Sequence, residues 1–251
     1  MKKIIFSLFI FPTMISAVAQ KKAIGLRSGI TISGISGDSR DSPGYNSIAS
    51  FYGTAFYVQQ VGNVLYIQPE ISWLTQGGQR DGILEISAFR PDIPVSGNQK
   101  LFADVHSTLR LNYINLSALA KLELGTRLKY FFCFGPFLST LVRAKTDLNG
   151  SSLIYGDADG KTQAFSTGPY SGTLKFDESV NIHEKISQFN FGIEGGAGIT
   201  FTAGKGRVVL DGRTTIGLTN IWKDSETNGN DKTGSFTLSV GYQFIINQGA
   251  N

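Results

Sequence analysis

The sequence predicts an all-β protein: an eight-stranded antiparallel up-and-down transmembrane β-barrel with short periplasmic turns and long extracellular loops. Three observations lead to this fold class. The N-terminus is typical of exported proteins, apolar and polar residues alternate in repeated stretches, and the connections are alternately short and long. The composition agrees, because 30 glycines, 18 phenylalanines and 9 tyrosines among 251 residues favour strands joined by tight turns.

The N-terminal segment has the pattern of a signal peptide. Lys2 and Lys3 precede an apolar run over residues 4–15, and residues 17–19 form the Ala-Val-Ala motif that signal peptidase cuts. A transmembrane anchor is the alternative, but the run is shorter than the roughly 20 residues that a spanning helix needs. We therefore predict a signal peptide over residues 1–19, cleaved after Ala19, and a barrel domain over residues 20–251 in the bacterial outer membrane.

Eight segments alternate with period two and are long enough to cross a bilayer as tilted strands. They cover residues 24–33, 50–60, 64–76, 108–124, 128–143, 187–203, 207–221 and 234–246. In the last segment Phe236, Leu238 and Val240 alternate with Thr237 and Ser239. The apolar row is the larger and more aromatic one, so we expect it to face lipid while the small polar row fills a narrow lumen.

The connections between these segments sort by length. Short turns lie around residues 61–63, 125–127 and 204–206, and the longer connections are 34–49, 77–107, 144–186 and 222–233. Short and long connections therefore lie at opposite ends, with both termini at the short-turn end, as in outer-membrane barrels.

Two features do not follow this regular pattern. Pro69 and Pro136 lie inside predicted strands, where each removes a ladder donor, so we expect a bulge or bend at both. The segment over residues 50–60 is apolar on both faces, and its lipid-facing side stays open.

Four segments resemble strands of the PorT-like outer-membrane β-barrels of Bacteroidetes, and they occur in the same order along the chain. Residues 66–71 (YIQPEI) resemble the "QPEL" strand of that family, and residues 113–121 (YINLSALAK) resemble its "YLEIPLLLKY" strand. Residues 134–136 (FGP) resemble its "GP" strand, and residues 191–198 (FGIEGGAG) its "D-x-G-x-x-x-G-x-G" strand, with Asn190 in place of the acid. The resemblance spans nearly the whole mature chain and implies the barrel fold.

The resemblance also bears on function. The family takes its name from a member linked to the type IX secretion and gliding apparatus, so the resemblance implies association with secretion proteins, and it supplies no catalytic motif. Asn115 and Ser117 stand where the family has an acid and a proline, which marks this chain as a divergent member.

Charged residues recur on the polar, lumen-facing row. They are Arg27, Glu70, Lys121, Glu123, Glu194, Asp211 and Arg213. Glu194 lies across a tight hairpin from Asp211 and Arg213, close enough to pair. One interpretation is a binding or proton-handling cluster. The other, which we favour, is a structural salt-bridge network, because charges buried in a narrow barrel must be paired.

Catalytic candidates are few. His106 and His183 lie near strand starts with Ser107 and Ser187 close by in sequence, as in an outer-membrane lipid-modifying enzyme, but no nucleophile-elbow pattern is present. We therefore predict that the chain is not an enzyme.

Cofactor and metal motifs are also weak. Asp157 and Asp159 begin a calcium-loop pattern that lacks its closing glutamate, so an acidic surface turn is the favoured interpretation. The glycines of residues 192–198 lack the lysine-serine ending of a phosphate loop and indicate barrel curvature and extra space in the lumen. We expect no cofactor and no bound metal.

Net charge and cysteine content argue against two other classes of protein, nucleic-acid-binding proteins and proteins stabilised by disulfides. Without Lys2 and Lys3, 21 of the 23 basic residues remain against 19 acidic ones, a net charge of +2 that does not favour nucleic-acid binding. Cys133 is the single cysteine, so no disulfide framework is possible.

Four functions remain open on the sequence. The first is a non-enzymatic envelope anchor, scaffold or binding protein, monomeric in the outer-membrane lipid, which meets envelope or secretion proteins through loops 77–107 and 144–186. The others are a narrow channel with a porin-like fold, an outer-membrane lipid-modifying enzyme, and a soluble periplasmic lipid-binding barrel.

Overall fold

The computed structural model describes residues 21–37, 44–87, 89–95, 97 and 99–247. The predicted signal peptide lies outside the described residues and stays a prediction. Among the described residues, no helix is both long enough and apolar enough to cross a membrane.

Nine strands make up most of the described chain. They are β1 (Lys22–Gly37), β2 (Ile48–Gln60), β3 (Leu65–Glu85), β4 (Phe102–Gly125), β5 (Leu128–Ser152), β6 (Leu174–Asn181), β7 (Phe189–Ala203), β8 (Gly206–Gly217) and β9 (Asp231–Asn247). A 3₁₀ turn, η2 (His183–Lys185), and a short helix, α1 (Ser225–Asn228), lie in the connections.

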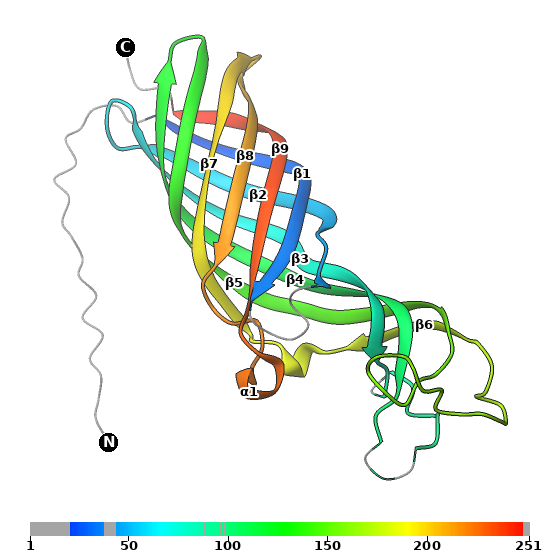
Figure 1. The fold of residues 1–251 in the computed structure, drawn as a ribbon. Coiled ribbons are helices and arrows are strands. Elements are labelled where there is room, and N and C mark those ends of the chain that lie inside the picture. Colours follow the sequence, from blue (N-terminus) through cyan, green and yellow to red (C-terminus); the bar gives the residue numbers. More distant parts are fainter. Residues whose placement is uncertain (1–20, 38–43, 88, 96, 98, 248–251) are drawn as a thin grey trace, which may run out of the picture.

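Eight of the strands close into a ring in the order β1-β2-β3-β4-β5-β7-β8-β9, and every neighbouring pair is antiparallel. The closing pair runs from Lys22 opposite Asn247 to Gly37 opposite Asp231. The predicted eight-stranded up-and-down barrel is therefore confirmed (Figure 1). The ninth strand, β6, was not predicted; it lies outside the ring and pairs with β5.

The short turns join β2 to β3, β4 to β5, and β7 to β8 at one end of the ring (Figure 1). Gly125 and Gly204 have φ values of 103° and 61°, in the left-handed region that favours glycine. Gly204 and Lys205 form the two-residue loop between β7 and β8. A glycine with positive φ at the first loop position is what a type II′ hairpin requires.

Much of the two segments that we expected to be long loops, 77–107 and 144–186, is strand instead. β3 and β4 stay paired from Leu65 opposite Leu122 to Glu85 opposite Phe102, and β5 runs past the ring to pair with β6. The result is a four-stranded sheet that projects beyond the barrel, at the lower right of Figure 1. We call residues 77–110 and 144–181, without those outside the described ranges, the outward extension.

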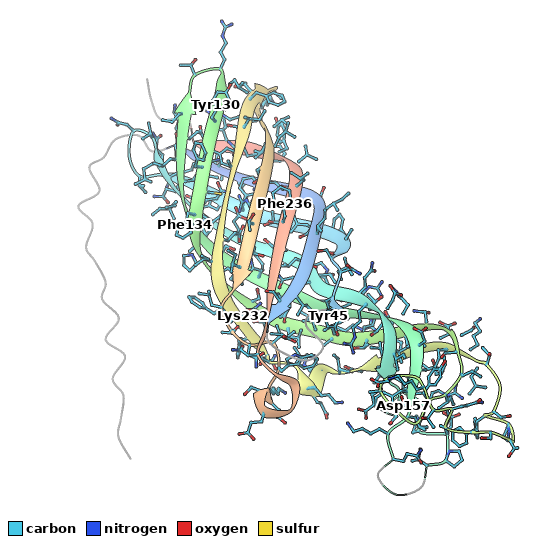
Figure 2. The ribbon with its side chains drawn as sticks, viewed as in Figure 1. Tyr45, Tyr130, Phe134, Asp157, Lys232 and Phe236 are labelled. Atoms are coloured by element: carbon cyan, nitrogen blue, oxygen red, sulfur yellow. The ribbon has the colours of Figure 1, made fainter. Side chains whose placement is uncertain are left out.

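The barrel wall has its apolar side chains outside. Phe134 and Phe236 point away from the barrel (Figure 2) and belong to a belt of exposed large apolar residues. In β2 the question left open by the sequence is resolved, because Phe51 is 65% exposed while Tyr52 is 6% exposed. An apolar exterior belt suits lipid and excludes the soluble periplasmic barrel, in which the apolar row would face inward.

The prolines interrupt hydrogen-bond ladders, and of the bulge or bend that we expected at each, the bulge is absent. Ladder pairs are missing around Pro69 in the β2–β3 ladder and around Pro136 in the β4–β5 ladder, but the register is the same on both sides. A register shift occurs instead between Asn112 and Tyr113 of β4, opposite Leu141 and Arg143 of β5. Each proline removes a ladder donor, but the register of the paired strands does not change.

Candidate functional site

Five of the predicted charged residues form one buried network in the middle of the lumen. Arg213 Nη1 lies 2.8 Å from Glu194 Oε1 and 2.9 Å from Glu70 Oε2, and its Nε lies 2.8 Å from Asp211 Oδ2. Arg27 Nη2 lies 2.7 Å from Glu70 Oε2, and Arg27 Nη1 also pairs with Asp211. Each carboxylate therefore meets at least one guanidinium, as charges removed from water must.

Neutral side chains complete this network, and none of them was assigned to it from the sequence. Ser117 donates to Glu194 at 2.6 Å, Gln68 donates to Glu70 at 2.5 Å, and Ser239 donates to Asp211. Asn115 continues the chain by donating to Ser117 at 3.0 Å. The same period-two alternation that identified the charges places these residues on the lumen face, so the signal was present in the sequence.

The other two predicted residues form a separate cluster near the periplasmic end. Glu123 lies 2.6 Å from Lys129 Nζ, 3.0 Å from Arg207 Nη1 and 3.5 Å from Lys121 Nζ. The Lys121 ammonium also lies 4.2 Å from the centroid of the Phe131 ring, a cation–π contact. Lys129 and Arg207 were not predicted, because they lie where the polar row reaches the turns.

A glycine of the cluster over residues 192–198 makes room for the central network. A Cβ atom on Gly196 would lie 2.8 Å from Cγ of Arg213. The close approach of β7 to this side chain therefore requires glycine, in agreement with its expected role in the lumen.

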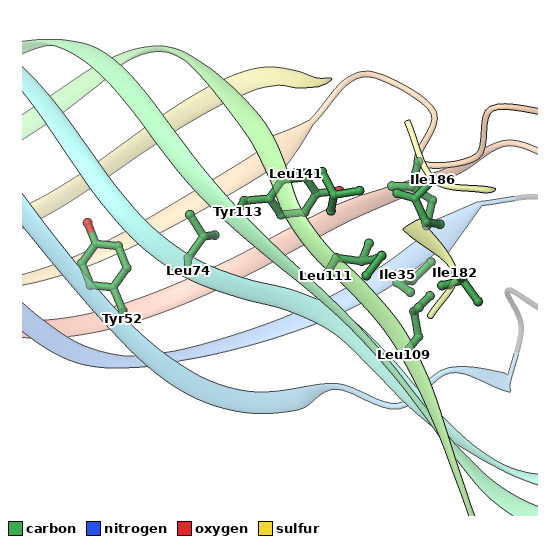
Figure 3. Close-up of a cluster of buried hydrophobic side chains, with 11 residues drawn as sticks. Ile35, Tyr52, Leu74, Leu109, Leu111, Tyr113, Leu141, Ile182 and Ile186 are labelled. Atoms are coloured by element: carbon green, nitrogen blue, oxygen red, sulfur yellow. The ribbon is translucent and has the colours of Figure 1, made fainter. Parts of the chain in front are cut away.

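Apolar layers close the lumen on both sides of the network. On the periplasmic side Phe56, Val58, Leu119, Phe131 and Cys133 belong to one buried cluster. On the extracellular side a second cluster fills the mouth of the barrel (Figure 3), with Tyr113, Leu111 and Leu141 from the wall and Ile182 and Ile186 from the β6–β7 connection. Between the charges and this upper plug lie hydrogen-bonded hydroxyl and amide groups, such as those of Gln76, Thr215 and Thr233.

The outward extension has an apolar core of its own. All four of its strands and the loop between β5 and β6 contribute to this core. Its buried residues include Leu84, Val105, Leu148, Ile154 and Phe176. Of the extension's described residues, Val95 is the single large apolar side chain that is exposed. The extension is therefore built like a water-soluble sheet.

The outer face of the extension carries polar side chains. Asp147 pairs with Arg110 and, at 3.0 Å, with Lys145. Burial alone would raise the pKa of Asp147, but hydrogen bonds from Ser179 and Lys145 and the two nearby cations hold it below its ordinary value of 3.8.

His106 also lies on this outer face. Its Nδ1 lies 2.8 Å from Asp81 Oδ1, and its Nε2 lies 3.2 Å from Thr108 Oγ1. Ser107 faces the opposite side of the strand, and Thr108, whose hydroxyl contacts this histidine, is only 5% exposed.

His183 and the acidic turn over residues 157–159 both lie in connections between strands. His183 lies in η2, where its backbone N–H donates to Asn181 at 2.9 Å. Asp157 (Figure 2) accepts three backbone N–H groups, at 3.0, 3.1 and 2.6 Å, and its pKa is lowered, first of all by the bond from Lys161. Asp159 pairs with the Lys161 side chain. Their carboxylates therefore hold the turn, and among the described residues no group of three or more metal-ligating side chains is found.

Solved structures with similar architecture include several outer-membrane barrels. Neisserial surface protein A is 10% identical, with a TM-score of 0.43 over 89% of this chain and 96% of that chain. The attachment invasion locus protein Ail of Yersinia pestis is 13% identical, with a TM-score of 0.39 over 89% of this chain and 99% of that chain. The N-terminal β-barrel domain of Pseudomonas aeruginosa OprF is 10% identical, with a TM-score of 0.33 over 88% and 97%.

The sequence itself gives the decisive comparison. No curated protein matches it. A family model described as "Outer membrane protein beta-barrel domain" matches residues 18–223. The chain therefore belongs to this family of outer-membrane β-barrel proteins.

Proposed function

We propose that this chain is a non-enzymatic barrel that anchors the outward extension in the outer membrane and presents it to a second envelope protein. The observation that carries the proposal is the separate apolar core of the extension, which contains Val105, Leu148 and Phe176. A sheet with its own core keeps a fixed shape outside the membrane, and a fixed polar surface suits recognition.

The filled lumen supports an anchor over a channel. Paired charges occupy its centre, and buried apolar clusters lie toward both ends. Because a narrow barrel packed with side chains leaves no continuous aqueous path, we expect no steady conductance of hydrophilic solutes in planar bilayers.

The finer family assignment is part of the same proposal. The four segments that resemble PorT-like barrels support membership in that group, and with it an association with a secretion apparatus. We further propose that the barrel is a monomer, because its wall closes on itself and leaves no open strand edge in the membrane.

Site-specific photo-crosslinking in cells tests the binding role. A photoreactive amino acid at position 100 or 175, both on the extension, should give a discrete adduct with one envelope protein. The same group at Asn63, in the turn between β2 and β3 at the opposite end, is the matched control and should not give that adduct. The same adduct at all three positions, or none at either extension position, would contradict the proposal.

A deletion tests whether the extension is separable from the anchor. Removal of residues 150–180 takes away the last three residues of β5, the β5–β6 loop and most of β6, but no residue that pairs within the eight-stranded ring. We expect a folded barrel that still shows a heat-dependent shift in gel mobility but no longer gives the adduct. Loss of the mobility shift would show that the barrel depends on this segment.

A further inference from the structure

Basic side chains gather at the periplasmic end of the barrel. They lie at the start of β1, in the β4–β5 and β7–β8 turns, and at the adjoining strand ends, and they are Lys21, Lys22, Arg127, Lys129, Lys205 and Arg207. Among the described residues, Glu123 is the carboxylate at this end, and it already pairs with Lys129 and Arg207.

Four of these cations have no carboxylate within ion-pair distance among the described residues, namely Lys21, Lys22, Arg127 and Lys205. Cations on the outward extension are arranged differently. Lys100 lies 2.7 Å from Glu85, and Arg110 and Lys145 both pair with Asp147. The described residues of the extension contain nine carboxylates and seven Lys or Arg side chains, whereas the periplasmic end has six basic side chains around Glu123, so the net positive charge lies at the end that faces the inner leaflet.

An open groove of about 460 Å³ lies at this rim and is lined by Arg127, Leu128, Phe201 and Thr202. Leu128 and Phe201 are directly opposite each other on β5 and β7 and are 40% and 37% exposed. The next lipid-facing residue on β5 is Tyr130, which belongs to the apolar belt. The groove thus joins a guanidinium and a hydroxyl at the rim to apolar walls that continue toward the bilayer.

We propose that this groove and the surrounding basic rim bind an anionic phospholipid of the inner leaflet. Its phosphate would meet Arg127 and Thr202, and an acyl chain would lie along Leu128 and Phe201. The apolar walls select a lipid over a soluble anionic polymer, because a polymer gains nothing from contact with them. Basic residues near a membrane surface attract anionic headgroups through the same electrostatic force.

Native mass spectrometry of the full mature barrel tests this proposal. The protein is refolded into nanodiscs of phosphatidylethanolamine with a minor fraction of phosphatidylglycerol, and the retained lipids are identified. We expect enrichment of phosphatidylglycerol on the wild type, and a roughly fivefold weaker enrichment in Arg127→Gln, as for the loss of one membrane-facing cation.

Lys161→Gln is the matched control, because Lys161 is an exposed cation at the far tip of the molecule. It should retain lipid like the wild type. Equal enrichment in Arg127→Gln and the wild type, or an equal loss in both variants, would overturn the proposal. Both substitutions lie on exposed side chains, and an unchanged heat-dependent mobility shift shows that the barrel is folded.

A soluble headgroup separates the lipid from a free phosphate. Excess glycerol phosphate should leave the bound phosphatidylglycerol in place if the apolar walls contribute to binding. Displacement of the lipid would show a phosphate site without acyl-chain recognition and would overturn the lipid assignment. An enrichment of phosphatidylglycerol that falls with added salt in the wild type and is absent in Leu128→Ser would support the lipid assignment.

Discussion

The barrel and the outward extension share three strands, β3, β4 and β5, but the inward faces of these strands have opposite compositions in the two regions. In the barrel part of β4, Ser117 and Lys121 face inward and Leu116 faces lipid. In the extension, Val105 and Leu109 face inward while the outer face is polar. Odd-numbered residues of β4 face inward in both regions. These residues are polar or charged where the outside of the strand meets lipid, and apolar where it meets water.

The inversion coincides with the register shift between β4 and β5. On β5 the buried residues are odd-numbered up to Leu141 and include Ala144 and Leu148 beyond it. One extra residue, Val142, moves the side-chain alternation by one position.

Four substitutions test the contrast between the charged interior of the barrel and the apolar core of the extension.

The largest effect is expected from Arg213→Met in the barrel. This change leaves Glu194, Asp211 and Glu70 without one of their cations, and the loss of one partner of a buried pair costs about 3–5 kcal/mol. Urea unfolding of the barrel in lipid vesicles, followed by the mobility shift, measures it. An unchanged midpoint would show that the network is not needed for stability.

Phe176→Ala should destabilise the extension alone. Phe176 is fully buried in the extension core, and truncation of a buried phenylalanine costs about 3–5 kcal/mol. We expect this loss to promote local opening of the extension. Limited proteolysis should cut the extension faster while the mobility shift of the barrel persists. If the barrel also unfolds at lower urea, the two regions are one cooperative unit.

Acid should loosen the extension through Asp147. Its pKa is lower in the folded chain than the ordinary value of 3.8, so its stabilising contribution is present above that value and is lost as the pH falls through the lowered pKa. Pepsin cleavage of the β5–β6 hairpin should therefore increase below about pH 4. In Asp147→Asn the cleavage rate should depend less on pH; an identical pH profile in both proteins would contradict the assignment.

Lys161→Ala should have the smallest effect. Its ammonium lies 3.1 Å from Asp159, but both side chains are highly exposed, and such pairs contribute about 0–1 kcal/mol. Thermal unfolding should match the wild type closely. A large shift would indicate that the turn held by Asp157 carries more of the extension's stability than its exposure suggests.

The failure to predict the extension has a physical cause. Gly77, Gly78 and Gly82 interrupt the alternation in the outer part of β3, so the pattern typical of a strand is lost there. The pairing of β6 with β5 also joins residues on opposite sides of a long connection, which no local pattern specifies. The apolar residues of the extension were visible in the sequence, but their common core was not.

The sequence by itself determined the eight strands of the ring, the end at which the short turns lie, and seven of the charged residues of the lumen row. Alternation, glycine and turn length are local properties, and the lipid surroundings make them unusually regular. Only the tertiary structure decided which charges on strands far apart in the sequence meet, as in the pairing of Arg27 with Asp211, and that β3, β4 and β5 continue into a second core. Ring closure brings distant strands together, and that geometry depends on the whole barrel and not on any one segment.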